Sequence, residues 1–208
     1  MSRGALIVLE GCDRAGKSTQ VKMLVKALNS QGISSEARVF PDRTTPVGEL
    51  IDKFLKYNKD LPPETIHLLF SANRWECSKE MINTLKNGTT LVVDRYAASG
   101  AAYTAANTGR ELAWCKAPDK GLPRPDMIAF LEVAEKEQSQ RGDWGAERFE
   151  HREFQRKVAA NFNKLHDDTW RYIDANEDAE KIHSKLLLET LEVIAKVKHC
   201  PIEQLYEP

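Results

Sequence analysis

Residues 11–18 constrain this chain more than any other part of its sequence. They read Gly-Cys-Asp-Arg-Ala-Gly-Lys-Ser and match the pattern G-x-x-x-x-G-K-[ST] in full. A continuous aliphatic run at 5–9 precedes them, and residues 17–29 follow with helical spacing of apolar side chains. Glycines in such a loop let backbone N–H groups turn inward at a helix N-terminus, where they bind phosphate groups. Residues 11–18, the P-loop from here on, are therefore predicted to bind a nucleotide triphosphate.

The side chains of the P-loop each suit a different part of phosphoryl transfer. Lys17 can reach the β- and γ-phosphates, and the Ser18 hydroxyl can ligate a Mg²⁺ ion that bridges phosphate oxygens. Arg14 can neutralise charge that develops on the transferred group. Asp13 repels phosphate, so it is expected to accept a hydrogen bond from a substrate hydroxyl. Alternatively, Asp13 and Arg14 could form an ion pair with each other on the surface and have no role in transfer.

Short apolar runs alternate with longer amphipathic segments along the chain. Strands are expected at 5–9, 36–40, 89–93, 127–131 and 170–173, and helices at 17–29, 46–57, 62–86, 154–165 and 179–196. The segment 98–108 is rich in small residues and fits either a helix or a loop. The alternation predicts an α/β fold: a doubly wound parallel sheet of about five strands, of the P-loop NTPase type, with helices on both faces. Ligands in such folds lie beyond the carboxyl ends of the strands.

Composition narrows the class of protein. The 208 residues, 41% of them hydrophobic, suffice for one sizeable core, so 1–208 is predicted to be a single domain. A net charge of −1 gives no basic footprint for nucleic acid. The four cysteines form no zinc-type cluster, and no apolar run approaches the roughly 20 residues of a membrane span. With no targeting segment visible, the expected location is the cytoplasm, with the nucleus left open.

An aliphatic run at 89–93 ends at Asp94, and Arg95 follows directly. A strand that ends in Asp is the form of the carboxylate that holds Mg²⁺ in P-loop proteins, directly or through water. Many strands also end in Asp for turn chemistry, but the P-loop favours the metal role. Ser18 and Asp94 are therefore predicted to form the metal site, and Arg95 to contact phosphates from the same edge.

A second substrate should meet cations for its phosphate and an aromatic ring for its base. Arg43 follows a predicted strand, and Phe70 and Arg74 lie one turn apart on a predicted helix. A ring that stacks on a base, next to an Arg that binds its carbonyl, would be a compact base reader. The alternative is a core Phe70 and a solvated Arg74.

The polar stretch around Gly142 and Gly145 carries Arg141 and Arg148. A flexible segment with two arginines suits a short lid, at about 136–150, that closes over phosphates and excludes water. A solvated loop is the alternative.

Taken together, these segments resemble the thymidylate kinases, specifically the eukaryotic form, over essentially the whole chain. The resemblance rests on ALIVLEGCDRAGKSTQ at 5–20, FPDR at 40–43, LLFSANRWE at 68–76, VVDRYAASG at 92–100, GLPRPD at 121–126 and ERFE at 147–150. The Asp-Arg pair inside the P-loop and the Asp-Arg-Tyr strand end are much more specific than the P-loop alone.

The resemblance implies a nucleoside monophosphate kinase that transfers the γ-phosphoryl group of ATP to dTMP, in dTTP synthesis for DNA replication. It also implies Mg²⁺ as cofactor and a homodimer, with the two nucleotides as partners. The catalytic residues would be Asp13, Arg14, Lys17 and Arg95. ATP would be held by Gly11, Arg14, Ala15, Gly16, Lys17, Ser18, Thr19 and Arg141. The residues that would bind dTMP are Asp13, which takes the 3′-hydroxyl, Phe40, Pro41, Arg43, Phe70, Arg74, Arg95, Ser99, Gly100, Tyr103, Phe149 and Gln155.

Two positions depart from the family pattern. Phe149 stands where related eukaryotic enzymes commonly have Tyr, and Tyr103 stands where some have Phe. Both rings would line the pocket beside the sugar and the edge of the base. The selectivity of this chain among acceptor nucleotides is therefore expected to differ from that of related enzymes.

Two other functions stay open from the sequence. The nearer is another nucleoside monophosphate kinase or a deoxynucleoside kinase. The other is a nucleotide-dependent switch or binding protein, although a GTPase-type Asn-Lys-x-Asp signature is missing from the sequence.

Overall fold

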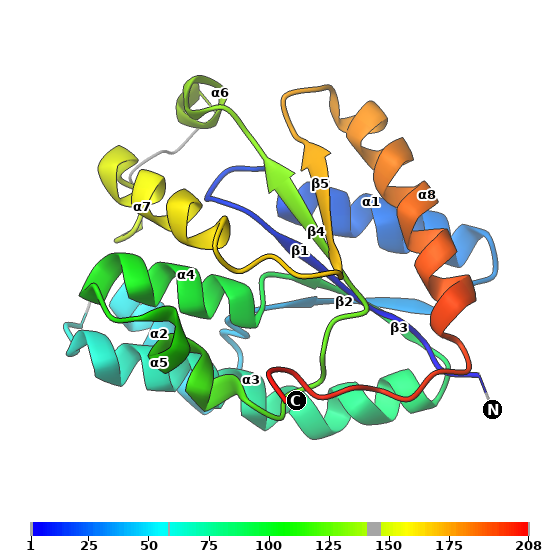
Figure 1. Ribbon diagram of the computed structural model, residues 1–208, viewed down its shortest axis with the longest axis horizontal. Helices are drawn as coiled ribbons and strands as arrows, with labels where there is room; N and C mark the ends of the chain where they lie inside the picture. Colours follow the sequence, from blue (N-terminus) through cyan, green and yellow to red (C-terminus); the bar gives the residue numbers. More distant parts are fainter. Residues whose placement is uncertain (1, 58, 141–146, 208) are drawn as a thin grey trace.

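A computed structural model describes residues 2–57, 59–140 and 147–207. Within them, five parallel strands form one sheet in the order β2-β3-β1-β4-β5 (Figure 1). The strands are β1 (Leu6–Glu10), β2 (Ser35–Val39), β3 (Thr90–Asp94), β4 (Met127–Glu132) and β5 (Trp170–Asp174). The chain winds from β1 first toward β2 and then back past β1 toward β5. The carboxyl end of β1 therefore lies at the point where a doubly wound sheet binds its ligand.

Helices cover both faces of the sheet, as the sequence predicted. They are α1 (Lys17–Ser30), α2 (Pro46–Leu55), α3 (Pro63–Lys86), α4 (Ala97–Thr108), α5 (Leu112–Lys116), α6 (Glu135–Gln140), α7 (Arg152–Phe162) and α8 (Ala179–Val197), with a 3₁₀ turn η1 (Ala117–Asp119). Helices α1 and α8 lie on one face, and α3, α4 and α7 lie on the other (Figure 1).

The central strands are apolar throughout because both of their faces are covered. Every residue of β1 is buried. Leu6 and Val8 belong to the core beneath α3, α4 and α7, whereas Ile7 and Leu9 belong to the core beneath α1 and α8. This alternation is the period of two that a strand imposes on its side chains, and it explains why an unbroken aliphatic run is needed before the P-loop.

The segment that fitted either a helix or a loop is helix α4. Its buried residues are small, among them Ala101 and Ala102, and it packs closely between α3 and α7. Gly109 ends the helix at a φ of 71°, the left-handed conformation that favours glycine at this position. A helix of small residues has little contrast between its faces, which is why its sequence pattern was ambiguous.

Most predicted boundaries agree with the structure to within two residues, but three features differ. Helix α7 ends at Phe162 rather than at residue 165. Helices α5 and α6 and the η1 turn were not predicted. The predicted lid at 136–150 begins within α6, and its residues 141–146 lie outside the described part of the chain.

Among the described residues, no helix combines the length and the apolar character needed to cross a membrane.

Candidate active site

A cavity of about 490 Å³ opens beyond the carboxyl ends of β1, β2 and β3. The predicted site residues that line it are Asp13, Arg14, Gly16, Lys17, Ser18, Thr19, Phe40, Pro41, Arg43, Phe70, Arg74, Asp94, Arg95, Ser99, Gly100, Tyr103 and Phe149. Sequence reasoning gave no role to the other lining residues, which are Val39, Leu55, Pro63, Ile66, Tyr96, Thr104, Asn107, Glu147 and Glu150. The fold thus gathers segments from positions 13 to 150 of the chain into one pocket.

The P-loop turns between β1 and α1 with positive φ at Gly11 (141°), Arg14 (62°) and Gly16 (93°). Gly11 has no substitute, because a Cβ there would lie 2.6 Å from the carbonyl oxygen of Leu131. The turn brings Lys17 back over the loop, where its Nζ donates to the carbonyl oxygens of Gly11 at 3.0 Å and Cys12 at 2.7 Å. The ammonium group is therefore held at the centre of the P-loop.

Lys17 is only 5% exposed. Its burial, aided by the positive charge of Arg95, lowers the pKa of Lys17 to about 8 against the opposing pull of Asp94 and Asp13. The lysine is thus an ammonium kept in a poorly solvated position, where an anion is bound much more strongly than on an exposed surface.

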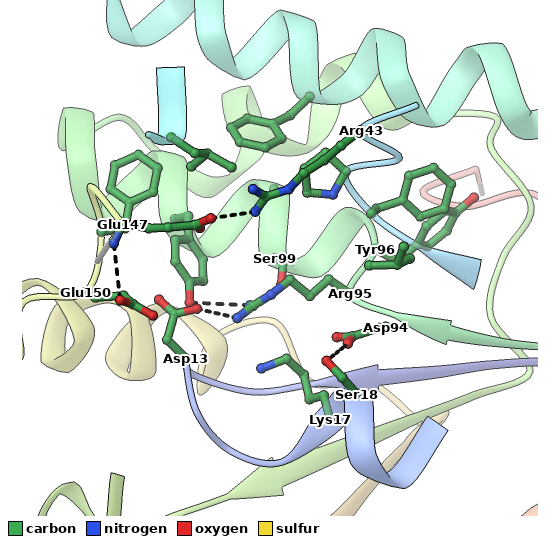
Figure 2. Close-up of a pocket in the computed structure, with 18 of the residues that line it drawn as sticks. Asp13, Lys17, Ser18, Arg43, Asp94, Arg95, Tyr96, Ser99, Glu147 and Glu150 are labelled. Carbon is green, nitrogen blue, oxygen red and sulfur yellow. Dashed lines mark hydrogen bonds and ion pairs between the residues drawn. The ribbon is translucent and has the colours of Figure 1, made fainter. Parts of the chain in front are cut away.

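Ser18 and Asp94 meet at the base of the pocket, as the sequence predicted for a metal site. The Ser18 hydroxyl donates to Asp94 Oδ2, and Figure 2 shows the two side chains turned toward each other. In the described part of the chain, no group of three or more His, Cys, Asp and Glu side chains gathers as a metal cluster. One hydroxyl and one carboxylate suit Mg²⁺, which prefers oxygen ligands and completes its shell with water and substrate phosphates.

Asp13 pairs across the pocket with Arg95, which follows β3 (Figure 2). Nη1 of Arg95 also donates to the Gly11 carbonyl oxygen at 3.2 Å and to the hydroxyls of Ser99 and Tyr103, both at 3.3 Å. Burial opposes the charge of this arginine, but Tyr103, Asp13 and Asp94 outweigh it and raise the pKa of Arg95. Arg95 is therefore a fixed cation between the P-loop and α4.

Glu10, the last residue of β1, is fully buried beneath this arrangement. Its carboxylate accepts from the backbone N–H groups of Tyr96 at 2.9 Å and Ser99 at 3.0 Å, and from the Ser99 hydroxyl at 2.5 Å. Burial raises the pKa of Glu10. Sequence reasoning missed this residue, although a glutamate that directly continues an aliphatic run into Gly11 was a usable signal. Glu10 ties the start of α4 to the P-loop.

Two glutamates after the undescribed segment reach into the pocket. Arg14 Nε lies 3.0 Å from Glu150 Oε1, and Arg43 Nη2 lies 2.8 Å from Glu147 Oε1. Arg43 also pairs with Asp52 at 2.6 Å. Asp13 and Arg14 therefore hold different partners, Arg95 and Glu150, instead of the surface pair that the sequence left open.

The base-reading pair lies on α3, at the other end of the cavity. Phe70 is partly buried beside the small apolar cluster around Ile51 and Phe54, and it lines the pocket. Arg74 is 2% exposed and forms a bidentate ion pair with Asp119. The alternative of a solvated Arg74 is therefore wrong, whereas Phe70 combines packing with a place in the pocket wall.

The two residues that depart from the family pattern are neighbours. The rings of Tyr103 and Phe149 meet edge to face at 5.9 Å, and Phe149 stacks on Phe154 at 5.0 Å. Burial raises the pKa of Tyr103 well above its usual value, so this hydroxyl stays neutral beside Arg95. Together these rings form an aromatic wall next to Asp13.

Several predicted site residues lie outside the pocket lining. Ala15 is buried in the core. Gln155 is 3% exposed and lies behind the P-loop, where its Oε1 accepts from the Asp13 backbone N–H at 3.0 Å and its Nε2 donates to Asp13 Oδ2 at 2.5 Å. Arg148, one of the two arginines of the predicted lid, also lies outside the lining: its guanidinium stacks on the rings of Phe54 and Tyr57 and pairs with Asp60.

Gly11, also outside the lining, contributes its carbonyl oxygen to Lys17 and Arg95. Arg141 lies outside the described residues.

Comparisons with known proteins agree with this geometry. A family model described as thymidylate kinase matches residues 9–186. Thymidylate kinase from Danio rerio is 45% identical over 98% of this chain and 98% of its own length. Thymidylate kinase from Homo sapiens is 43% identical over 99% of this chain and 98% of its own length. The solved structure of thymidylate kinase from Candida albicans, reported to reveal the origin of broad substrate specificity, superimposes with a TM-score of 0.85. It is 36% identical and covers 100% of this chain and 97% of that chain.

The buried charge of Lys17 makes stability depend on pH. We expect Lys17→Met to raise the free energy of unfolding by about 3 kcal/mol at neutral pH without nucleotide, because it removes a charge that burial disfavours. The folded-state pKa of about 8 lies below the usual 10.5. Between these pH values the unfolded chain holds more protons, so the wild-type protein gains stability as pH rises. The advantage of Lys17→Met is thus largest below pH 8 and vanishes as pH passes 10.5.

Urea unfolding of both proteins across this pH range measures the difference. Lys22→Met, at an exposed position of the same helix, is the matched control and should show no such trend. A stability difference that is independent of pH would contradict the assignment.

Proposed function

The chain belongs to the thymidylate kinase family and acts on dTMP with ATP as phosphoryl donor, and we propose how the pocket beyond β1, β2 and β3 holds both substrates. The P-loop side binds ATP, and the side formed by Arg43, Phe70, Arg74 and Arg95 binds dTMP. The observation that carries this division is that Lys17 and Ser18 line the same cavity as these four residues. Two nucleotides bound from opposite ends would meet at Arg14 and Arg95.

The chemistry that this arrangement requires is mainly alignment and charge screening. The acceptor phosphate and the γ-phosphate repel each other, so cations must lie between and around them. Lys17 faces the donor side, and Arg95 faces the acceptor side at the carboxyl end of β3. Because Arg95 is anchored by Asp13, Ser99 and Tyr103, it needs little reorganisation when the acceptor phosphate arrives.

We place a Mg²⁺ ion at Ser18 and Asp94, the donor set described above. When bound there, Mg²⁺ would neutralise negative charge on the donor phosphates. The Ser18 hydroxyl, which donates to Asp94, would turn its lone pairs to the ion. Asp94 would hold the ion from the end of β3.

Asp13 is proposed to accept a hydrogen bond from the 3′-hydroxyl of dTMP. Its carboxylate lies beside the aromatic wall of Tyr103 and Phe149 and is fixed by Gln155. A carboxylate held between Arg95 and Gln155 presents an oriented lone pair to a hydroxyl donor. Its negative charge repels phosphate groups, so a phosphate does not bind there.

The acceptor preference is the sharpest test of this function. In a coupled assay of ADP release, dTMP should be phosphorylated faster than dGMP, dCMP, AMP or thymidine. Arg43 and Arg95 are placed to bind a monophosphate, Phe70 to stack on a pyrimidine, and Arg74 to donate to a carbonyl on the edge of the base. The rate with dUMP, which has the same carbonyls, measures what the 5-methyl group adds. A preference for thymidine would favour a deoxynucleoside kinase, and a preference for a purine nucleotide would favour another monophosphate kinase. No phosphoryl transfer to any acceptor, with both nucleotides and Mg²⁺ present, would favour a pure binding protein.

Arg14 is proposed to stabilise charge on the phosphoryl group during transfer. We expect Arg14→Ala to lower kcat about 1,000-fold, the scale of an arginine that acts in the transition state, while the dissociation constant for ATP changes only a few-fold. Steady-state kinetics and ATP titration separate the two effects. The control is Arg156→Ala, which removes an exposed arginine of α7. An unchanged kcat for Arg14→Ala would remove this role.

We also propose that two copies of the chain associate through α3. Leu68 and Trp75 are two turns apart on this helix and remain 51% and 42% exposed, and large apolar side chains exposed on one helix suit a protein–protein contact. Sedimentation equilibrium should therefore give about twice the chain mass of 23.5 kDa, and Leu68→Glu should shift it toward the monomer. A wild-type protein that stays monomeric at micromolar concentration would contradict this.

A further inference from the structure

Arg74 reaches the pocket as an almost completely buried cation. Its Nε lies 3.0 Å from Asp119 Oδ1, and its Nη2 lies 2.7 Å from Asp119 Oδ2. Arg74 is 2% exposed and Asp119 is 0% exposed. Two parallel hydrogen bonds from a planar fork fix both the plane and the rotation of the guanidinium.

The neighbouring helix limits the guanidinium further. A Cβ at Gly100 of α4 would lie 2.7 Å from Nη2 of Arg74 and 3.2 Å from Nη1, so the backbone of α4 packs against the group. Among the described residues, no acceptor is placed on Nη1, and Arg74 lines the cavity. Asp119 therefore leaves one edge of the arginine for a ligand.

Asp119 is itself rigidly held. The Ser71 hydroxyl donates to its Oδ1 at 2.7 Å and lies 3.0 Å from the Pro118 carbonyl oxygen, which accepts from the Trp75 indole at 2.7 Å. Next to it, residues 121–122 pair with the C-terminal tail: Gly121 N–H donates to Leu205 and Leu205 N–H donates to Leu122, at 2.9 and 2.7 Å. Buried Leu205 anchors this tail in the core.

We propose that Asp119 is a positioning residue for acceptor recognition, which fixes Arg74 so that Nη1 meets a carbonyl oxygen on the edge of the base. This role rests on the proposed function, in which dTMP occupies this end of the pocket. A base with an amino group at that edge would place a donor against a donor and would be rejected. The η1 turn, which carries Asp119, thereby takes part in substrate selection without touching the substrate.

A purely stabilising role would not require this pair. Burying two charges is costly, and a buried ion pair is often no more stabilising than packed apolar side chains of the same volume. The pair does, however, give an arginine a unique orientation in a poorly solvated site, where a misplaced donor loses most of its hydrogen-bond strength.

The test is steady-state kinetics of Asp119→Asn with dTMP and ATP varied separately. We expect KM for dTMP to rise about 10- to 100-fold, the scale of a lost hydrogen bond from a charged group. KM for ATP should stay within about twofold and kcat within a few-fold, because the P-loop is untouched. Asp126→Asn is the matched control: it breaks another bidentate pair, with Arg3 near the chain termini, and should leave KM for dTMP unchanged.

A double-mutant cycle identifies the route of the effect. If Asp119 acts through Arg74, adding Asp119→Asn to Arg74→Gln should change KM for dTMP less than about twofold. If Asp119→Asn does not fold, Ser71→Ala, which removes the donor to Asp119, should still raise that KM a few-fold.

Equal rises in KM for dTMP and ATP, or an unchanged KM for dTMP in Asp119→Asn, would overturn the proposal. So would an unchanged KM for dTMP in Ser71→Ala where Asp119→Asn does not fold. Wild-type turnover of dTMP in the same assay tests the proposed function separately. If the wild-type enzyme does not turn over dTMP, both the proposed function and the role of Asp119 are rejected. If it does, and Asp119→Asn leaves KM for dTMP unchanged, only the role of Asp119 is rejected.

Discussion

The concentration of positive charge in one small cavity is the constraint on which the rest of this structure depends. Cations that share a poorly solvated space repel one another, so each must be compensated locally. Among the described lining residues, every arginine has a carboxylate partner from another part of the fold. The pairs are Arg14 with Glu150, Arg43 with Asp52 and Glu147, Arg74 with Asp119, and Arg95 with Asp13. This explains how a chain of near-zero net charge forms a site for two polyanions.

The pairs differ in how readily they exchange partners. The Arg43 and Glu147 side chains are 37% and 34% exposed, so a substrate phosphate can replace this glutamate at little cost. The Arg74–Asp119 pair is almost fully buried, and separating it would leave an uncompensated charge. Arg43 is therefore suited to bind and release a phosphate, whereas Arg74 is suited to stay in one orientation and read a base. Glu147 and Glu150 lie at the end of the predicted lid, so this segment supplies negative charge that compensates Arg43 and Arg14.

Local sequence patterns predicted the sheet, the P-loop and the strand end at Asp94, because each depends on neighbours along the chain. Partners distant in sequence could not be found in this way. No local pattern links Arg74 to Asp119 or Arg43 to Glu147, since the fold alone brings them together. The same reason explains Gln155, whose hydrogen bonds to Asp13 place it behind the P-loop instead of in the pocket. The contacts of Arg148 with Phe54 and Tyr57 were also beyond reach, because an arginine that packs on aromatic rings looks like any other arginine in sequence.

In the proposed arrangement, one cavity aligns ATP and dTMP for direct transfer of a phosphoryl group. The most direct measurement is a single-turnover reaction with ATP labelled in its γ-phosphate, excess enzyme, Mg²⁺ and dTMP, followed by separation of the nucleotides. We expect the label to appear in dTDP, and only when dTMP is present. Label released as inorganic phosphate, with no labelled dTDP, would contradict it.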